Sequence, residues 1–145
     1  MQDRFKFRLY DKAIGEMAYD VCVGFIKDYG KTDDWVCADT SCGQITYRGN
    51  KVKDIVLMQC TGLKDKNGKL IYEADIVKYK DEVYGLCIGR IEKDNAHYEL
   101  LYYTGEKYGW FSHILCFKHI KNMEVIGNIY ENPELLERNN DKTTG

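Results

Sequence analysis

The stretch from Thr61 to Tyr79 reads TGLKDKNGKLIYEADIVKY and carries the clearest structural signal in the chain. It contains Asn67-Gly68, a dipeptide typical of tight hairpins, because both residues accept the positive φ that a primed turn requires. Residues 70–72 follow as a short apolar segment, and residues 76–79 have the composition of a strand. The stretch therefore predicts a β-hairpin with its turn at Asn67-Gly68, and it carries no evident chemistry.

Other strand-like segments precede and follow this hairpin. Phe5, Phe7 and Leu9 alternate with more polar residues, as on a strand with one buried face. Residues 21–29 are compatible with a strand or a short helix, and we favour a strand. Further segments of strand length, separated by turns, are 16–20, 54–60, 84–92, 97–103, 108–111 and 123–130. This spacing predicts a mainly β fold, an antiparallel barrel or sandwich of short strands.

Glycines and helix signals add detail to this prediction. Gly85 and Gly89 lie four residues apart in one strand and would ease the coiling that barrel closure needs. Residues 112–121 permit a single helical turn. Near the C-terminus, Asn132 is suited to cap a helix whose first residue is Pro133. We predict a short helix ending at residue 138, a polar tail over 139–145, and one β domain over 1–138 with 30–53 as a candidate loop-rich insertion.

Composition limits the classes of protein that the chain can represent. Of its 145 residues, 44% are apolar, which suffices for a sizeable core. A net charge of −2 and a pI near 5.9 argue against a broad phosphate-binding face, although a local basic patch stays open. The charged start and the lack of a long apolar segment predict neither a signal peptide nor a membrane span. We therefore expect the six cysteines to be reduced thiols, several of them buried, in a cytoplasmic protein.

Three segments together carry a family resemblance. They are KFRLYD (6–11), LMQCTGLKDKNGKLIYEADIVKY (57–79) and EVIGNIYENPELLE (124–137). As a set they closely resemble the YopX-like family, small proteins encoded by temperate phages and prophages of low-GC Gram-positive bacteria. The resemblance covers most of the chain, but residues 15–52 contain no matching motif. It implies a largely β fold and a phage or prophage origin in a bacterial cytoplasm, and it supplies no catalytic residues.

One position departs from the family pattern. Where the family has EGDIV, this chain has Glu73-Ala74-Asp75-Ile76-Val77. If the family glycine serves a positive φ, Ala74 would strain the turn, whereas at a simple strand entry alanine would be harmless.

Candidate reactive sites are weakly supported. A calcium loop around Asn67-Gly68 is rejected, because Leu63 and Ala74 would stand where two essential carboxylate ligands are needed. Glu73 and Asp75 would share a strand face as a carboxylate pair does, yet no partner for acid–base chemistry lies nearby in sequence. Nucleophile and phosphate-binding motifs are lacking as well. We predict that the protein is not an enzyme.

Cysteine and histidine spacing raises the question of a metal site. Cys37 and Cys42 are close in sequence, and His113, Cys116 and His119 recur at every third position. Zinc sites need about four donors, often as two close pairs, and this spacing is looser than such sites show. Buried cysteines and surface histidines are the simpler account, so we predict no metal and no cofactor.

Aromatic residues give the one candidate binding region. Single-stranded nucleic acid stacks on exposed rings, but it normally does so within a basic groove, and here Lys107 is flanked by Glu99 and Glu106. Core packing or a subunit interface explains the rings equally well. We predict a non-enzymatic, self-associating phage accessory protein, with a phage or host protein as a further partner, nucleic-acid binding as the alternative and no membrane partner. The candidate binding residues are Tyr98, Tyr102, Tyr103, Tyr108, Trp110 and Phe111.

Overall fold

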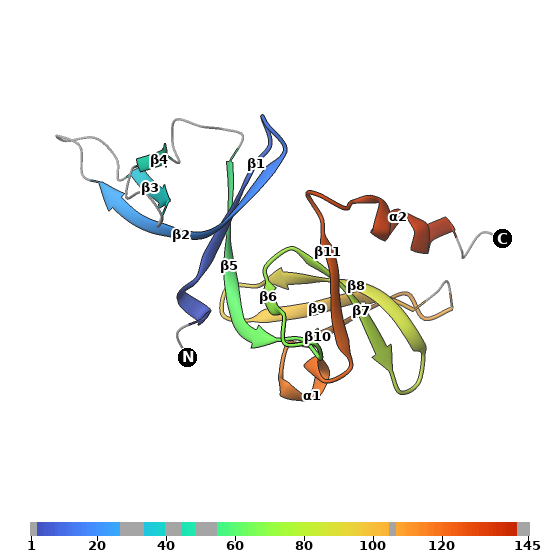
Figure 1. The fold of residues 1–145 in the computed structure, drawn as a ribbon. Coiled ribbons are helices and arrows are strands. Elements are labelled where there is room, and N and C mark those ends of the chain that lie inside the picture. Colours follow the sequence, from blue (N-terminus) through green and yellow to red (C-terminus); the bar gives the residue numbers. More distant parts are fainter. Residues whose placement is uncertain (1–2, 27–33, 40–44, 49–54, 105–106, 142–145) are drawn as a thin grey trace. The chain divides into compact units, whose positions relative to one another are not determined.

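The computed structural model describes residues 3–26, 34–39, 45–48, 55–104 and 107–141 (Figure 1). The chain groups into two compact units, which we call the N-terminal unit (residues 4–59) and the C-terminal unit (residues 60–145). Both are built from antiparallel strands, so the prediction of a mainly β protein is confirmed. The prediction of one domain stays a prediction, because a compact unit defined by contacts is not necessarily an independent folding unit.

In the N-terminal unit the strands are ordered β4-β3-β2-β1-β5. Leu9 and Val21 form the buried centre of this unit, with Leu57 packed against them. The predicted strand over residues 21–29 is confirmed as far as Ile26, and its last residues lie outside the described part. Residues 30–53 contain β3 and β4. The strands are β1 (Phe7–Asp11), β2 (Glu16–Ile26), β3 (Asp34–Asp39), β4 (Ile45–Arg48) and β5 (Ile55–Lys64), preceded by the 3-10 turn η1 (Asp3–Phe5).

The predicted hairpin joins β5 to β6 (Leu70–Tyr72), but its turn is not of the primed type. Gly68 has φ +80°, whereas Asn67 is not among the residues with positive φ. The N–H of Gly68 donates to the Asp65 carbonyl at 3.0 Å, and the N–H of Asp65 donates to Lys69 at 2.8 Å. Asn67-Gly68 thus marks the hairpin correctly, while a single left-handed glycine closes the turn.

The C-terminal unit contains a five-stranded sheet ordered β10-β9-β8-β7-β11. Tyr102, Leu100 and Met123 are fully buried on its inner face, and Ile71 of β6 packs into the same core. Within this unit, therefore, β6, which pairs with β5 in the six-stranded sheet, covers the inner face of the five-stranded sheet, as in a sandwich. No ladder in the described residues closes the five-stranded sheet into a barrel. The strands are β7 (Asp75–Asp81), β8 (Gly85–Lys93), β9 (Tyr98–Tyr103), β10 (Trp110–Ile114) and β11 (Met123–Asn128) (Figure 1).

The two glycines of β8 do not serve barrel closure, and that part of the prediction is wrong. Gly85 has φ +77° at the end of the β7–β8 turn. Gly89 faces the core at a point where a Cβ atom would lie 2.5 Å from the Leu101 carbonyl oxygen. It therefore permits close approach of β8 to β9 rather than coiling.

Two helices follow the β10 and β11 strands: α1 (Phe117–Ile120) and α2 (Glu134–Asp141). The single helical turn and the C-terminal helix are both confirmed, although α2 continues past residue 138. The proposed capping role of the Asn132 side chain is wrong, because its Oδ1 accepts the N–H of Asn128 at 3.2 Å. Its backbone carbonyl instead accepts the N–H of Leu135. In the described residues no helix is long and apolar enough to cross a membrane.

Candidate binding face

The six predicted aromatic residues lie on both faces of the sheet, so they do not form one surface. Tyr102 is fully buried, and its ring lies 5.5 Å from that of Tyr79 and 6.2 Å from that of Phe111. Tyr98 also packs against the core. Tyr103 and Trp110, which are direct partners in the β9–β10 ladder with rings 5.3 Å apart, belong to the other face. Tyr108 lies between β9 and β10, half exposed, with the Lys107 ammonium 5.1 Å from its ring centre.

The face opposite the core, which we call the outer face, carries exposed apolar side chains. Alternation places Leu86, Trp110 and Ile114 on it, and they are 68%, 56% and 61% exposed. Single exposed apolar residues are ordinary, but Trp110 is also the direct ladder partner of the half-buried Tyr103. The outer face is defined by Leu86, Ile88, Leu101, Tyr103, Trp110 and Ile114.

The two edges of the five-stranded sheet differ. At the β11 edge, the N–H of Lys66 donates to Met123 O at 3.0 Å, and the N–H of Val125 donates to Asp65 Oδ2 at 2.9 Å. At the β10 edge, no backbone hydrogen bond links the side of β10 that faces away from β9 to another described residue. The β10 sequence, WFSHI, has no lysine, acidic residue or proline of the kind that protects an edge. One edge is covered, and the other is open at Trp110 and Ser112, whereas the Ile114 carbonyl lies 3.1 Å from His119 Nδ1.

The ladder geometry identifies which β10 groups face the open edge. The N–H of Thr104 donates to Gly109 O, and the N–H of Leu115 donates to Tyr98 O. Because hydrogen-bonded and non-bonded pairs alternate in an antiparallel ladder, Phe111 and His113 direct their backbone groups to β9. Trp110, Ser112 and Ile114 therefore direct theirs outward.

Beside β10 lies a small pocket of about 200 Å³ that we call the histidine pocket. Its wall includes Tyr79, Asp81, His113 and His119. The hydroxyl of the buried Tyr102 donates to Asp81 Oδ2 at 3.0 Å and lies 2.7 Å from His113 Nε2. Since the one hydroxyl proton goes to the carboxylate, His113 donates from Nε2 to the tyrosine oxygen. The chain of hydrogen bonds thus runs from His113 through Tyr102 to Asp81.

This chain of hydrogen bonds links the buried ring of Tyr102 to the β7–β8 turn. Burial and the hydrogen bond to Asp81 raise the pKa of Tyr102. Burial alone would raise the pKa of Asp81, but the N–H groups of Tyr84 and Val83, the Tyr102 hydroxyl and the nearby His113 outweigh it and lower that pKa. A tyrosine held protonated beside a carboxylate held ionised is a poor proton shuttle near neutral pH. Asp81 instead closes the β7–β8 turn and anchors the buried ring.

The structure brings the predicted His113, Cys116 and His119 together. The two imidazole rings are stacked at 5.0 Å, and Cys116 Sγ lies 3.4 Å from His119 Nδ1. His119 Nδ1 also lies 3.1 Å from the Ile114 carbonyl, so it carries a proton to donate. Burial, and then the proximity of His113, lower the pKa of His119. Cys42 and the side chain of Cys37 lie outside the described residues. That no metal binds at His113, Cys116 and His119 stays a prediction.

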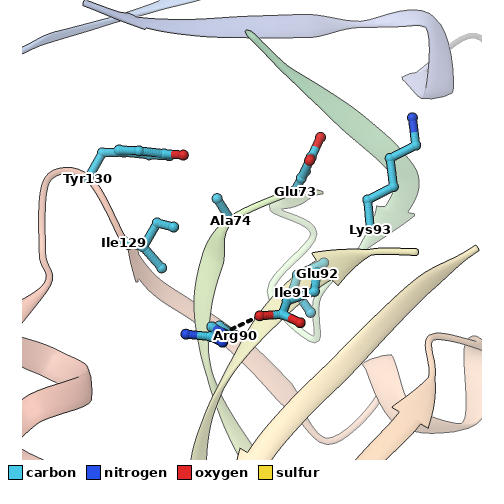
Figure 2. Close-up of a pocket in the computed structure, with 8 residues that line it drawn as sticks. All are labelled: Glu73, Ala74, Arg90, Ile91, Glu92, Lys93, Ile129 and Tyr130. Carbon is cyan, nitrogen blue, oxygen red and sulfur yellow. Dashed lines mark ion pairs between the residues drawn. The ribbon is translucent and has the colours of Figure 1, made fainter. Parts of the chain in front are cut away.

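A second pocket, of about 360 Å³, is bordered by the β6–β7 turn, the end of β8 and the residues after β11 (Figure 2). Ala74 in this turn has φ +70°. Its N–H donates to Ile91 O at 2.9 Å, and its carbonyl accepts the N–H of Ile129 at 3.0 Å. These two bonds fix alanine in the left-handed region, so the strained alternative for this position is the correct one.

The carboxylate pair predicted beside Ala74 is not formed. Glu73 lies in the turn rather than on β7, and it borders the pocket. Asp75 is buried, and its carboxylate accepts the N–H of Tyr72 at 2.8 Å. The pocket is also lined by an ion pair between Arg90 and Glu92, drawn as a dashed line in Figure 2. The prediction that Glu73 and Asp75 share a strand face is therefore wrong.

Three comparisons relate the chain to known proteins. A family model described as YopX protein matches residues 6–137. Protein yopX from Bacillus subtilis has a similar structure, with 21% identity and a TM-score of 0.57, covering 92% of this chain and 98% of that one. Protein EF1440 from Enterococcus faecalis is similar with 25% identity and a TM-score of 0.52, covering 90% and 96%. Among curated proteins no match was found. The fold is thus shared over nearly the full length of both solved chains.

Proposed function

The chain belongs to the YopX family, and we propose that it is a non-enzymatic binding module that pairs with a second copy of itself through β10. The observation that carries this proposal is the open β10 edge, with its uncharged sequence and its outward backbone groups at Trp110, Ser112 and Ile114. Unpaired strand edges recruit another strand unless they are protected. In this reading the protein is a phage accessory factor of the bacterial cytoplasm, where the thiols of Cys60 and Cys87 stay reduced.

A second copy is the occupant that suits this edge best. Two β10 strands related by a two-fold axis run antiparallel, so each donates to and accepts from the same residues of its partner. Ser112 is the middle residue of β10, and it is an outward one, which lets the pairing centre on it. The pairing would join two five-stranded sheets into one continuous sheet.

The outer face supports the same arrangement. Trp110 and Ile114 project from the edge strand itself, so in a pairing centred on Ser112 the Trp110 side chain of each copy would lie beside Ile114 of the other. Burying these exposed apolar groups adds the hydrophobic contribution that backbone hydrogen bonds alone lack. Nucleic-acid binding is disfavoured by the same geometry, because Tyr102 is buried and Phe111 packs toward the core.

Sedimentation of the wild type, Ser112→Pro and Ser112→Ala tests the proposal. Both substitutions remove the bond from Ser112 Oγ to Glu99, but only proline removes the outward N–H. Proline at this position leaves the β9 ladder intact, because the pairing bonds come from Phe111 and His113. We expect dimers at micromolar concentration for the wild type and Ser112→Ala, and monomers for a folded Ser112→Pro.

Two outcomes would contradict the proposal. One is a wild type that sediments as a monomer at tens of micromolar. The other is a folded Ser112→Pro, with an unchanged circular dichroism spectrum, that associates as tightly as Ser112→Ala. Salt-sensitive fluorescence anisotropy with single-stranded DNA or RNA, observed for a monomeric wild type, would overturn it in favour of nucleic-acid binding.

A further inference from the structure

Three metal-ligating side chains converge at the turn between β8 and β9. The N–H of Asp94 donates to the His97 carbonyl at 2.8 Å and closes the turn. His97 Nε2 then lies 2.9 Å from Glu99 Oε1 and 4.0 Å from Asp94 Oδ2. In the described part of the chain, this is the group of three whose ligand atoms all lie within 4.8 Å of one another.

Each carboxylate is oriented by a second hydrogen bond. Asp94 Oδ1 accepts the N–H of Asn95 at 2.7 Å, which leaves Oδ2 toward His97. Glu99 Oε2 accepts the hydroxyl of Ser112 at 3.0 Å, which leaves Oε1 toward His97. Outer contacts that fix the orientation of ligand side chains are a regular feature of metal sites.

The local charge also favours a cation. Glu92 stands directly opposite Glu99 in the β8–β9 ladder, an arrangement of like charges that destabilises a strand pair. Arg90 pairs with Glu92 from the same strand, whereas Asp94 and Glu99 both direct a carboxylate oxygen toward His97. A doubly charged ion there would relieve the repulsion between these groups.

We propose that Asp94, His97 and Glu99 bind a divalent transition-metal ion such as Zn²⁺. His97 Nε2 and one oxygen of each carboxylate supply three ligands, and water completes a tetrahedral site. The imidazole and the low ligand number suit Zn²⁺ rather than Ca²⁺, which takes six or more oxygens. The ion would tie the β8–β9 turn to β9 and, through Ser112, to β10. This inference does not depend on the proposed dimer.

The sequence contained a signal for this site that motif reasoning missed. The spacing D-x-x-H-x-E over residues 94–99 spans a tight turn and the start of a strand. His97 and Glu99 alternate with Tyr98, so they share one face, and the turn brings Asp94 back beside them.

Calorimetric titration of the full chain with ZnCl₂ at neutral pH tests the proposal. We expect one saturable site in the wild type, and a dissociation constant raised by roughly tenfold or more in His97→Gln, Asp94→Asn and Glu99→Gln. The matched control is Glu92→Gln, which removes an equal charge directly opposite Glu99 without removing a ligand. It should lose far less Zn²⁺ affinity than the three ligand variants, because Arg90 already pairs with Glu92. Zn²⁺ should also raise the melting temperature of the wild type and of Glu92→Gln, but not that of His97→Gln.

Several results would overturn the proposal. A folded wild type without saturable Zn²⁺ binding would do so directly. Equal Zn²⁺ affinity in His97→Gln and the wild type would place the ion elsewhere, for example on Cys116 and His119. An equal loss of affinity in Glu92→Gln would show diffuse attraction by negative charge instead of ligation.

Discussion

The two edges of the five-stranded sheet differ in whether their outward backbone groups are hydrogen-bonded within the chain. At β11, the β5–β6 hairpin supplies both an N–H donor from Lys66 and a carboxylate acceptor from Asp65. At β10, the outward backbone groups of Trp110 and Ser112 accept or donate no backbone hydrogen bond within the described residues, and at Ile114 only the carbonyl is covered, by His119 Nδ1. An edge that is closed inside the chain contributes to folding, whereas an open one is available for association. The difference locates stability at one side of the sheet and binding at the other.

Removing Asp65 should have the largest effect, because this carboxylate closes the β11 edge. It is 6% exposed and accepts the N–H groups of Asn67, Lys69 and Val125 at 2.8 to 2.9 Å. We expect Asp65→Ala to lower the free energy of unfolding by about 3 kcal/mol or more, since buried donors lose a charged acceptor. Urea unfolding followed by circular dichroism measures this. Lys66→Ala, which removes only an exposed ion pair with Glu124, should change stability by less than about 1 kcal/mol.

A substitution at Ala74, the alanine with a left-handed backbone conformation, should raise the free energy of unfolding. Ala74 holds the segment after β11 through its carbonyl, at φ +70°. Ala74→Gly should stabilise the protein by roughly 0.5 to 1 kcal/mol, because relief of the strained φ outweighs the added entropy of the unfolded chain. Ala18→Gly on β2, where φ is not positive, should instead destabilise it by a similar amount. A destabilised Ala74→Gly protein would show that the strain is not present.

A charge on the open edge should weaken association much more than it lowers the stability of the monomer. Trp110 is 56% exposed and points away from the core. Trp110→Glu should therefore lower the free energy of unfolding by no more than about 1 kcal/mol when measured on dilute protein, through loss of the ring contact with Tyr103. In the dimer each new carboxylate would lie opposite the apolar Ile114 of the other copy without a partner of opposite charge, so sedimentation should show at least a tenfold weaker association. A large loss of monomer stability would show that Trp110 is packed within its own chain.

Acidification should produce the smallest change in the free energy of unfolding. This change should arise at His119, which lies beside β10. The pKa of His119 is lowered by burial and by His113, so the unfolded chain binds protons more readily than the folded one. Stability should decline as pH falls through about 6.5 and level off below the folded pKa. His119→Gln should remove this decline in urea unfolding measured at several pH values. Asp81, whose pKa is lowered, should contribute a separate loss only as pH falls below 3.8.

Local chemistry in the sequence predicted much of this fold. Asn67-Gly68 marked the hairpin because glycine in the left-handed region is typical of turns. The sequence also identified Ala74 as a position of possible backbone strain, because alanine stands where the family pattern has glycine. The role of Asp65 was invisible, since its partner Val125 is 60 residues away. The covered β11 edge therefore depended on a contact that only the folded chain reveals.

The binding region shows the same limit. Tyr102 and Tyr103 are neighbours on β9 and must face opposite sides of the sheet. The six aromatic residues could therefore never have formed a single platform. Which side faces the core depends on β6, whose Ile71 packs against the inner face. The stacking of His113 on His119 likewise depends on how α1 follows β10, which residue spacing alone does not determine.

Residue-resolved amide hydrogen exchange at low and high protein concentration tests the contrast between the edges most directly. The N–H groups of Trp110, Ser112 and Ile114 should exchange rapidly in dilute protein and become protected as concentration rises, while that of Val125 stays protected throughout. Protection of the three β10 groups at every concentration, or exposure at every concentration, would contradict the account.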